Sequence, residues 1–280
     1  MSKQAALERI GTKVVLPSSP EILTRITMMM EDPQVGIPEI GAEAGKDPGI
    51  TSRLLRLANS AHYGLSVPVV APEQAVAVIG VRMLRNIALQ TSVMQQYDEL
   101  ALELDCDLTA HWRHAALVAS MAHDLGRRLG RADLLPEEMY TSGLMHDVGK
   151  VVLLDSLRED YATLLEAAAR SRRECQELEE SVLGFTHADV GAMLAERWNF
   201  PERMCRAIGE HHVPAEDLVD RPATAVVALA DRLAYALDST GCEELLPEIA
   251  GLAEESVGLA AEAFADWVRH AREMRVEVEI

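Results

Sequence analysis

Proline and glycine divide this chain into short segments, and most of these segments have the hydrophobic spacing of a helix. In the segment 47–64, Asp47 can cap a helix and Pro48 suits its first position. The segment 19–32 begins in the same way, with Ser19 as the expected cap and Pro20 at the first helical position. This punctuation predicts a fold built from many helices of modest length.

Further helices are expected at 111–130, 136–156, 186–200, 201–212 and 221–237, and two more near the C-terminus. Aromatic residues are only 4% of the chain, while alanine and leucine are abundant, and this also favours helix over strand. We therefore predict an all-α fold.

Two short stretches depart from the helical pattern. Residues 275–280 (RVEVEI) alternate like a strand, and we expect this end of the chain to fray. Residues 98–107 (DELALELDCD) are acidic and are expected to form looser turns. That stretch is our candidate boundary between an N-terminal helical region, 1–98, and a second region, 99–280.

The overall charge limits the choice of partners. The formal net charge is −19 and the sequence pI is about 4.8, so a nucleic acid backbone would be repelled. Neither a signal peptide nor a membrane-spanning segment is evident, and we expect a cytoplasmic protein without a membrane partner. The four cysteines form no CxxC pair, which argues against a disulfide framework: Cys106, Cys175, Cys205 and Cys242.

Two His-Asp dipeptides are candidates for metal binding, since imidazole nitrogen and carboxylate oxygen both suit divalent metals. They are His123-Asp124 and His146-Asp147. His123 follows His114 by nine residues on one expected helix, which places the two about 180° apart. We therefore expect His123-Asp124 to lie on the surface and favour His146-Asp147 as the functional pair.

Further histidines and acids lie on separate segments of the second region. Any one of them alone is more simply explained as a residue with a local polar partner. Asp231 is an example, because its apolar surroundings require a partner, which could be Arg232 or a metal ion. Facing helices can nevertheless bring such side chains to one interior point. The candidate metal ligands are His114, His146, Asp147, His187, His211, His212 and Asp231.

The order His114, His146-Asp147, Asp231 resembles the H…HD…D signature of the HD metal-dependent phosphohydrolase superfamily. His187 and the pair His211-His212 resemble the additional histidines of its two-metal branch, which includes HD-GYP phosphodiesterases. The resemblance implies a first metal at His114, His146, Asp147 and Asp231. It also implies a second metal at His187 and one of His211 or His212, with Lys150 contacting a phosphate oxygen. The metal would be iron, manganese, nickel or zinc.

A broader resemblance extends from about Leu16 to about Leu237 and is to HDOD domains, the HD-related output domains of bacterial signalling proteins. Its motifs, in order, include "HWRHA", "SGLMHDVGKVVLLDS" and "GFTHADVGAMLAERWNFPERMCRAIGEHHVP". The resemblance implies a two-lobed all-α architecture with an HD-like helical bundle as the second lobe. It further implies a regulatory role through protein–protein interaction.

Two functions are open at this point. The first is a non-hydrolytic signalling module that binds a partner protein, with a mononuclear or dinuclear structural metal site or with a vestigial site that binds none. The alternative is a metal-dependent phosphohydrolase or phosphodiesterase acting on a small phosphorylated ligand, with Asp147 and Lys150 in catalytic roles. Cyclic di-GMP is not expected as the substrate, because the segment after His211-His212 lacks the HD-GYP pattern.

Overall fold

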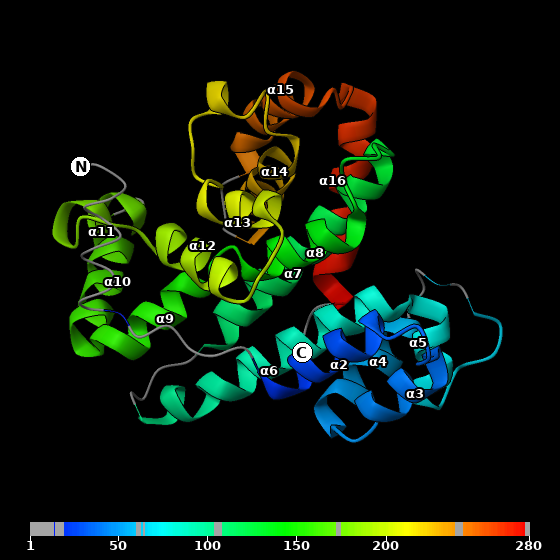
Figure 1. Ribbon diagram of the computed structural model, residues 1–280. Coiled ribbons are helices and arrows are strands. Elements are labelled where there is room, and N and C mark those ends of the chain that lie inside the picture. The colour runs from blue at the N-terminus through cyan, green and yellow to red at the C-terminus, as the bar shows by residue number, and fades with distance from the viewer. Residues whose placement is uncertain are drawn as a thin grey trace. The chain divides into compact units, whose positions relative to one another are not determined.

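The structure is a computed structural model, and its described residues are helical or lie in turns and loops, with no strand among them (Figure 1). The all-α prediction is therefore confirmed. Ser19, Cys106 and Cys242 lie outside the described part of the chain. The described residues are 14, 20–59, 63, 65–103, 108–171, 175–238 and 243–277.

The helices fall into two compact units, and the smaller one spans Ser18–Glu99. Within it, α3 packs against α2 and α5, and α4 packs against α5. The Asp47 side chain accepts a hydrogen bond from the backbone N–H of Ile50, as expected of a helix cap. The helices are α2 (Glu21–Glu31), α3 (Ile37–Ala44), α4 (Pro48–Ala58), α5 (Pro72–Ile79) and α6 (Val81–Glu103).

The larger unit includes the chain from Leu100 onward. Its first helices are α7 (Thr109–Leu129), α8 (Pro136–Met145), α9 (Val148–Leu157), α10 (Glu159–Ser171) and α11 (Cys175–Val182). They are followed by α12 (His187–Arg197), α13 (Glu202–Gly209), α14 (Pro222–Asp238), α15 (Leu246–Val257) and α16 (Ala261–Glu277). No helix in the described ranges is long and apolar enough to cross a membrane.

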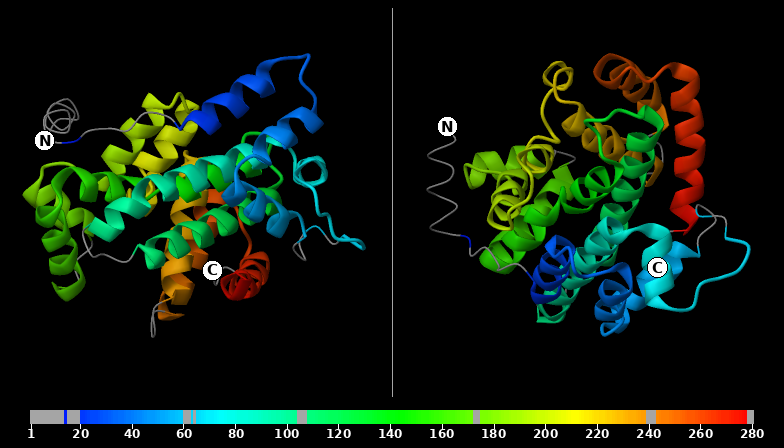
Figure 2. Two further views of the ribbon diagram at one scale, coloured as in Figure 1. Left: turned by 90° about the horizontal axis from the view of Figure 1, so that it is seen from below. Right: turned by 45° about the vertical axis from the view of Figure 1, so that its right-hand side comes forward.

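The core of the larger unit lies where α7, α8, α14, α15 and α16 meet. Leu117 and Met121 of α7 contribute to this core, with Leu229 of α14 and Trp267 of α16, all almost fully buried. Figure 2 shows α16 beside α14 and α15, which agrees with their packing contacts. Burial of this apolar area holds α7 and α14 together, and both helices extend to the site described below.

Helix α6 continues through part of the stretch that we expected to form turns. It ends at Glu103, so residues 98–103 are helical and only 104–107 lie outside the described residues. Val93, Tyr97 and Leu100 are buried at the spacing of one helical face. This apolar face extends the helix past the acidic residues.

The strand-like alternation at the C-terminus does not form a strand at residues 275–277, and these residues, which we expected to fray, belong to α16. Phe264, Trp267, Val268 and Ala271 are buried on one face of this helix, and Met274 packs against the same core. The helical spacing of this longer segment outweighs the short alternation at its end. Residues 278–280 lie outside the described part.

Candidate metal centre

The pair His146-Asp147 lies at a break between two helices. Helix α8 ends at Met145 and α9 begins at Val148, so the expected continuous helix over 136–156 is wrong at this point. His146 Nδ1 lies 2.7 Å from the carbonyl oxygen of Gly143, in the last turn of α8. Asp147 has φ −102° and ψ 6°, outside helical geometry. The break leaves both side chains buried, with exposed fractions of 0% and 4%.

Helices α9 and α12 touch at a glycine beside this pair. A Cβ atom on Gly149 would lie 1.9 Å from the carbonyl oxygen of His187, so only glycine fits there. Helix α12 starts at His187 because Thr186 and Asp189 form a capping box around its first turn. This close contact brings His187 Nε2 to 3.1 Å from Asp147 Oδ1.

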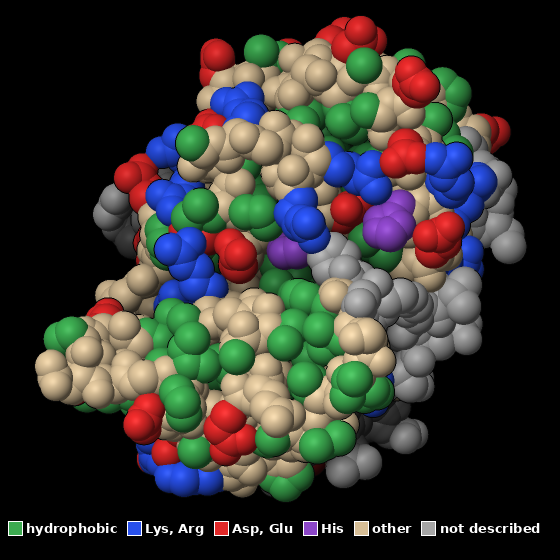
Figure 3. All heavy atoms as spheres, turned by 90° about the vertical axis from the view of Figure 1, so that its right-hand side faces the viewer, with side chains coloured by type: hydrophobic (Ala, Val, Ile, Leu, Met, Phe, Trp, Pro, Cys, Tyr) green, Lys and Arg blue, Asp and Glu red, His purple; other side chains and the backbone are tan. Residues whose placement is uncertain are grey.

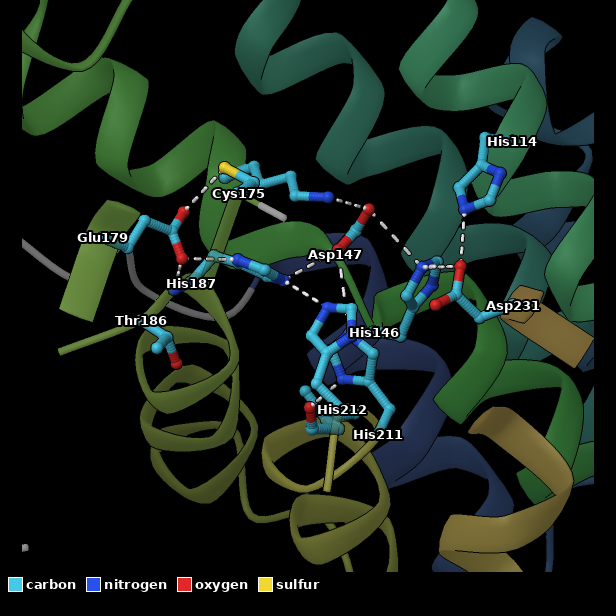
Figure 4. A network of polar contacts seen from close by, with 12 residues as sticks. His114, His146, Asp147, Cys175, Glu179, Thr186, His187, His211, His212 and Asp231 are labelled. Carbon is cyan, nitrogen blue, oxygen red and sulfur yellow. Dashed lines mark hydrogen bonds and ion pairs between the residues drawn. The ribbon is translucent and has the colours of Figure 1, made fainter. Parts of the chain in front are cut away.

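The candidate ligands come together in two adjacent groups (Figure 4). His114 on α7, His146 and Asp231 on α14 form the first group, with one potential ligand atom from each within 4.8 Å of the others. His146 Nε2 also lies 3.4 Å from Asp147 Oδ2.

The second group consists of Asp147, His187, His211 and His212. Both histidines of the pair belong to it, although we expected only one. That expectation assumed a helix, on which adjacent side chains diverge by about 100°. The pair instead follows the end of α13 in a turn, and His212 Nε2 lies 3.2 Å from His187 Nε2.

Asp231 pairs with histidines and not with the neighbouring arginine. Its Oδ1 lies 3.0 Å from His114 Nε2 and 3.6 Å from His146 Nε2. Arg232 donates instead to the carbonyl oxygen of Val213. Of the alternatives that the sequence left open for Asp231, the pairing with Arg232 is thus not observed.

A lysine balances the charge of the central carboxylate. Lys150 Nζ lies 2.6 Å from Asp147 Oδ2. Burial alone would raise the pKa of Asp147, but Lys150 and His146 hold this pKa well below its usual range. Burial likewise opposes protonation of His146, yet Asp147 and Asp231 outweigh it and raise the pKa of His146 to about 10. Without a metal ion, the first group is therefore a charged network.

The second group contains an arrangement that protons alone do not satisfy. His211 Nδ1 lies 2.7 Å from the carbonyl oxygen of Ile208, which assigns its proton to Nδ1. Burial and the neighbouring His212 hold the pKa of His211 well below its usual range, so its ring is neutral. Its Nε2 atom therefore carries a lone pair, lies 3.8 Å from Asp147 Oδ1 and is buried without a hydrogen-bond partner. Asp147 Oδ1 is likewise without a donor when the neighbouring His187 Nε2, 3.1 Å away, carries no proton. A cation between two such acceptors would satisfy both, so these residues fit a metal ion.

Sequence reasoning missed one buried residue at this site. Glu179 on α11 is fully buried, and its Oε2 lies 2.7 Å from His187 Nδ1. Its segment is rich in exposed acids, and Glu180 next to it is exposed, so residue type alone could not distinguish the two. The only available signal was its place eight residues before His187.

The pair His123-Asp124 is outside both groups of potential ligands. We expected this pair on the surface, but the structure does not place it there. Asp124 is only 8% exposed and accepts a hydrogen bond from Arg128 at 2.6 Å. Arg128 also bonds Asp266 on α16 at 2.7 Å. His123 is partly buried, and its ring lies edge-on to Tyr140. Arg128 thus satisfies Asp124 and links α7 to α16.

Helices with an interior His/Asp set of this kind define the class of HD-related proteins. The comparison with family models is more specific: residues 16–214 match the HDOD domain, and the chain belongs to the HDOD family. A curated protein of Treponema pallidum (strain Nichols), itself uncharacterised, is 29% identical over 236 residues. The match covers 83% of this chain and 44% of that protein, so the chain spans less than half of its relative's length.

Solved structures from other bacteria share the fold. An HDOD domain protein of unknown function from Geobacter sulfurreducens matches with a TM-score of 0.76 at 24% identity, covering 99% of this chain and 95% of that one. A candidate phosphohydrolase of Shewanella amazonensis SB2B matches with a TM-score of 0.72 at 23% identity, covering 98% of each chain. A candidate signal transduction protein of Marinobacter aquaeolei VT8 matches with a TM-score of 0.69 at 21% identity, covering 99% of this chain and 65% of that one. At these identities the likeness establishes the fold alone.

Proposed function

We propose that this chain is a regulatory module of bacterial signalling that binds a partner protein, contains a divalent metal site at its His/Asp groups and does not hydrolyse a substrate. The metal would be iron, manganese, nickel or zinc, in one or two positions. Two buried acceptor atoms without a hydrogen-bond partner, His211 Nε2 and Asp147 Oδ1, support the metal site.

The burial of the central ligands is the observation that favours a non-hydrolytic role. His146, His187 and His211 are at most 1% exposed. A catalytic metal needs an open position that water and substrate can reach, whereas a structural metal is enclosed by protein ligands. Lys150 in addition occupies one oxygen of Asp147. The Marinobacter relative, described as a candidate signal transduction protein, is consistent with this role.

The charge distribution supports a protein partner over a nucleic acid. The net charge is −19, and on the face shown in Figure 3 the lysine and arginine side chains are interspersed with acidic ones. A nucleic acid partner would require a continuous basic surface. We therefore propose neither nucleic acid nor a membrane as the partner.

A second candidate function is a metal-dependent phosphohydrolase acting on a small phosphorylated ligand. The specific observation in its favour is that one side of the first group is partly open, because the side chains of His114 and Asp231 are 22% and 17% exposed. In that case a bound metal would activate water and stabilise charge on a phosphoryl oxygen. Asp147 would hold the metal and Lys150 would bind the phosphate. Relatives from Shewanella amazonensis SB2B are described as candidate phosphohydrolases.

Elemental analysis of protein purified without a histidine tag, combined with a hydrolysis assay, tests the proposal. We expect near-stoichiometric metal in the wild type and its loss in Asp147→Ala. Asp155→Ala is the matched control, since Asp155 lies on α9, which begins directly after Asp147, but its side chain is 43% exposed and pairs only loosely with Arg158 at 3.7 Å. We expect no turnover of bis-p-nitrophenyl phosphate by protein loaded with any of the four metals.

Two results would contradict different parts of the proposal. Turnover that requires metal and disappears in Asp147→Ala, but not in Asp155→Ala, would replace the regulatory proposal with the phosphohydrolase. Wild-type protein without metal, even after growth with added metal salts, would refute the metal site.

A further inference from the structure

Glu179 is a buried carboxylate whose oxygens are all engaged by donors. The hydroxyl of Tyr161 on α10 donates to Oε1 at 2.5 Å, and the thiol of Cys175 lies 3.4 Å from the same oxygen. The backbone N–H of His187 donates to Oε2 at 2.9 Å, and His187 Nδ1 lies 2.7 Å from it. A carboxylate buried in this way has to be paired, and its ion-pair partner among the described residues is His187.

Glu179 could alternatively be a metal ligand itself, because Cys175, Glu179 and His187 form a third group of potential ligands. One observation argues against this role. Both oxygens of Glu179 already accept two hydrogen bonds or close polar contacts each.

The contact with Glu179 determines which nitrogen of His187 is available. When Nδ1–H points to Glu179 Oε2, the lone pair of a neutral imidazole is on Nε2. Nε2 is the atom that lies 3.1 Å from Asp147 Oδ1 and 3.2 Å from His212 Nε2 (Figure 4). The His187 ring therefore connects Glu179, through Nδ1, to Asp147 and His212 of the second group, through Nε2.

We propose that Glu179 is a positioning residue that fixes the tautomer and orientation of His187 and so strengthens metal binding at the group of Asp147, His187, His211 and His212. This inference rests on the proposed metal site and adds a residue to it. Carboxylates that accept the second N–H of a ligating histidine fix its ring and raise its basicity, and their loss weakens metal affinity roughly 10- to 100-fold.

The test is Glu179→Gln, with Glu180→Gln as matched control because Glu180 is adjacent, has the same charge and is exposed. Zn²⁺ affinity is measured by competition with a chelator, and circular dichroism checks the fold. We expect one Zn²⁺ equivalent to bind roughly 10- to 100-fold more weakly in Glu179→Gln, while binding at the first group stays unchanged. Glu180→Gln should match the wild type, and Glu179→Asp, which retains the charge, should recover part of the affinity.

A second readout does not depend on whether a variant folds. Nitrogen-15 NMR of histidine-labelled, Zn²⁺-loaded wild type should show His187 with its proton on Nδ1 and the metal on Nε2. The opposite arrangement would overturn the proposal.

The remaining outcomes separate this inference from the proposed function. Unchanged Zn²⁺ affinity in Glu179→Gln, or equal weakening of all bound Zn²⁺ together with a lower melting temperature, would overturn the positioning role but not the metal site. Weaker Zn²⁺ binding in Cys175→Ala would also overturn the positioning role, because it would show that Cys175, Glu179 and His187 bind the metal directly. Wild type without Zn²⁺ binding would instead refute the proposed function.

Discussion

His111 shows how one buried nitrogen can make stability depend on pH. It lies one helical turn before His114, and its Nε2 is buried without a hydrogen-bond partner. Burial lowers the pKa of His111 to about 3. The ring is therefore neutral in the folded protein at every pH where an exposed histidine would begin to gain a proton.

The sign of this effect follows from proton uptake. Below about pH 6.5 the unfolded chain binds a proton at His111 that the folded protein does not bind, so stability falls as the pH drops toward 3. We expect His111→Leu to reduce the slope of unfolding free energy against pH by up to about 1.4 kcal/mol per pH unit in this window. Urea unfolding of chelator-treated protein at several pH values measures this slope. Equal slopes for the wild type and His111→Leu would show that His111 does not contribute. His270→Leu, at an exposed position on α16, is the control.

At the scale of elements, the contact between α9 and α12 depends on the absence of one side chain. Gly149→Ala would place a methyl group 1.9 Å from the carbonyl oxygen of His187, so the two helices would have to separate. We expect a loss of roughly 1–3 kcal/mol or more in unfolding free energy, together with weaker metal binding.

Gly251→Ala is the matched control within a helix, because nothing lies within 4 Å of the added Cβ on α15. Alanine should stabilise that helix by roughly 0.5–1 kcal/mol. Thermal melts and metal analysis of the two variants give the comparison. Similar stability changes at both glycines would contradict the importance of the close contact.

The sequence predicted helices better than it predicted their ends. A cap with its own side-chain chemistry was predicted correctly at Asp47. The break at His146-Asp147 was not, because the segment is apolar on both sides and only packing against α7 and α12 decides where the helix stops. Glu103 and Glu277 are helical for the same reason, since buried apolar faces extend α6 and α16.

The candidate site was predictable as a set of residues but not as a geometry. The order of the histidines and acids on the chain identified each member of the two groups. The sequence could not reveal that His211 and His212 lie in a turn, that Asp124 is buried beneath Arg128, or that Glu179 faces inward. Each of these depends on contacts between segments far apart in the chain.

For the whole molecule, the net charge of −19 predicts a response to salt. Uniform negative charge destabilises a compact chain by self-repulsion, and salt screens that repulsion. We expect the thermal midpoint to rise when NaCl is increased from about 0.01 M to about 0.15 M, a range over which the screening length falls from about 30 Å to about 8 Å. Differential scanning calorimetry at fixed pH measures the midpoint, and a decrease would mean that attractive surface ion pairs dominate.

Lys150 gives the site a cation of its own. Because its ammonium group is 2.6 Å from Asp147 Oδ2, the buried carboxylate is compensated before any metal arrives. Metal uptake at that oxygen would be an exchange of one cation for another, unlike the coupled binding and folding of zinc fingers. Under the proposed metal site, the helices around it are therefore expected to stay assembled before metal binds, because Lys150 already compensates the charge of Asp147 at Oδ2.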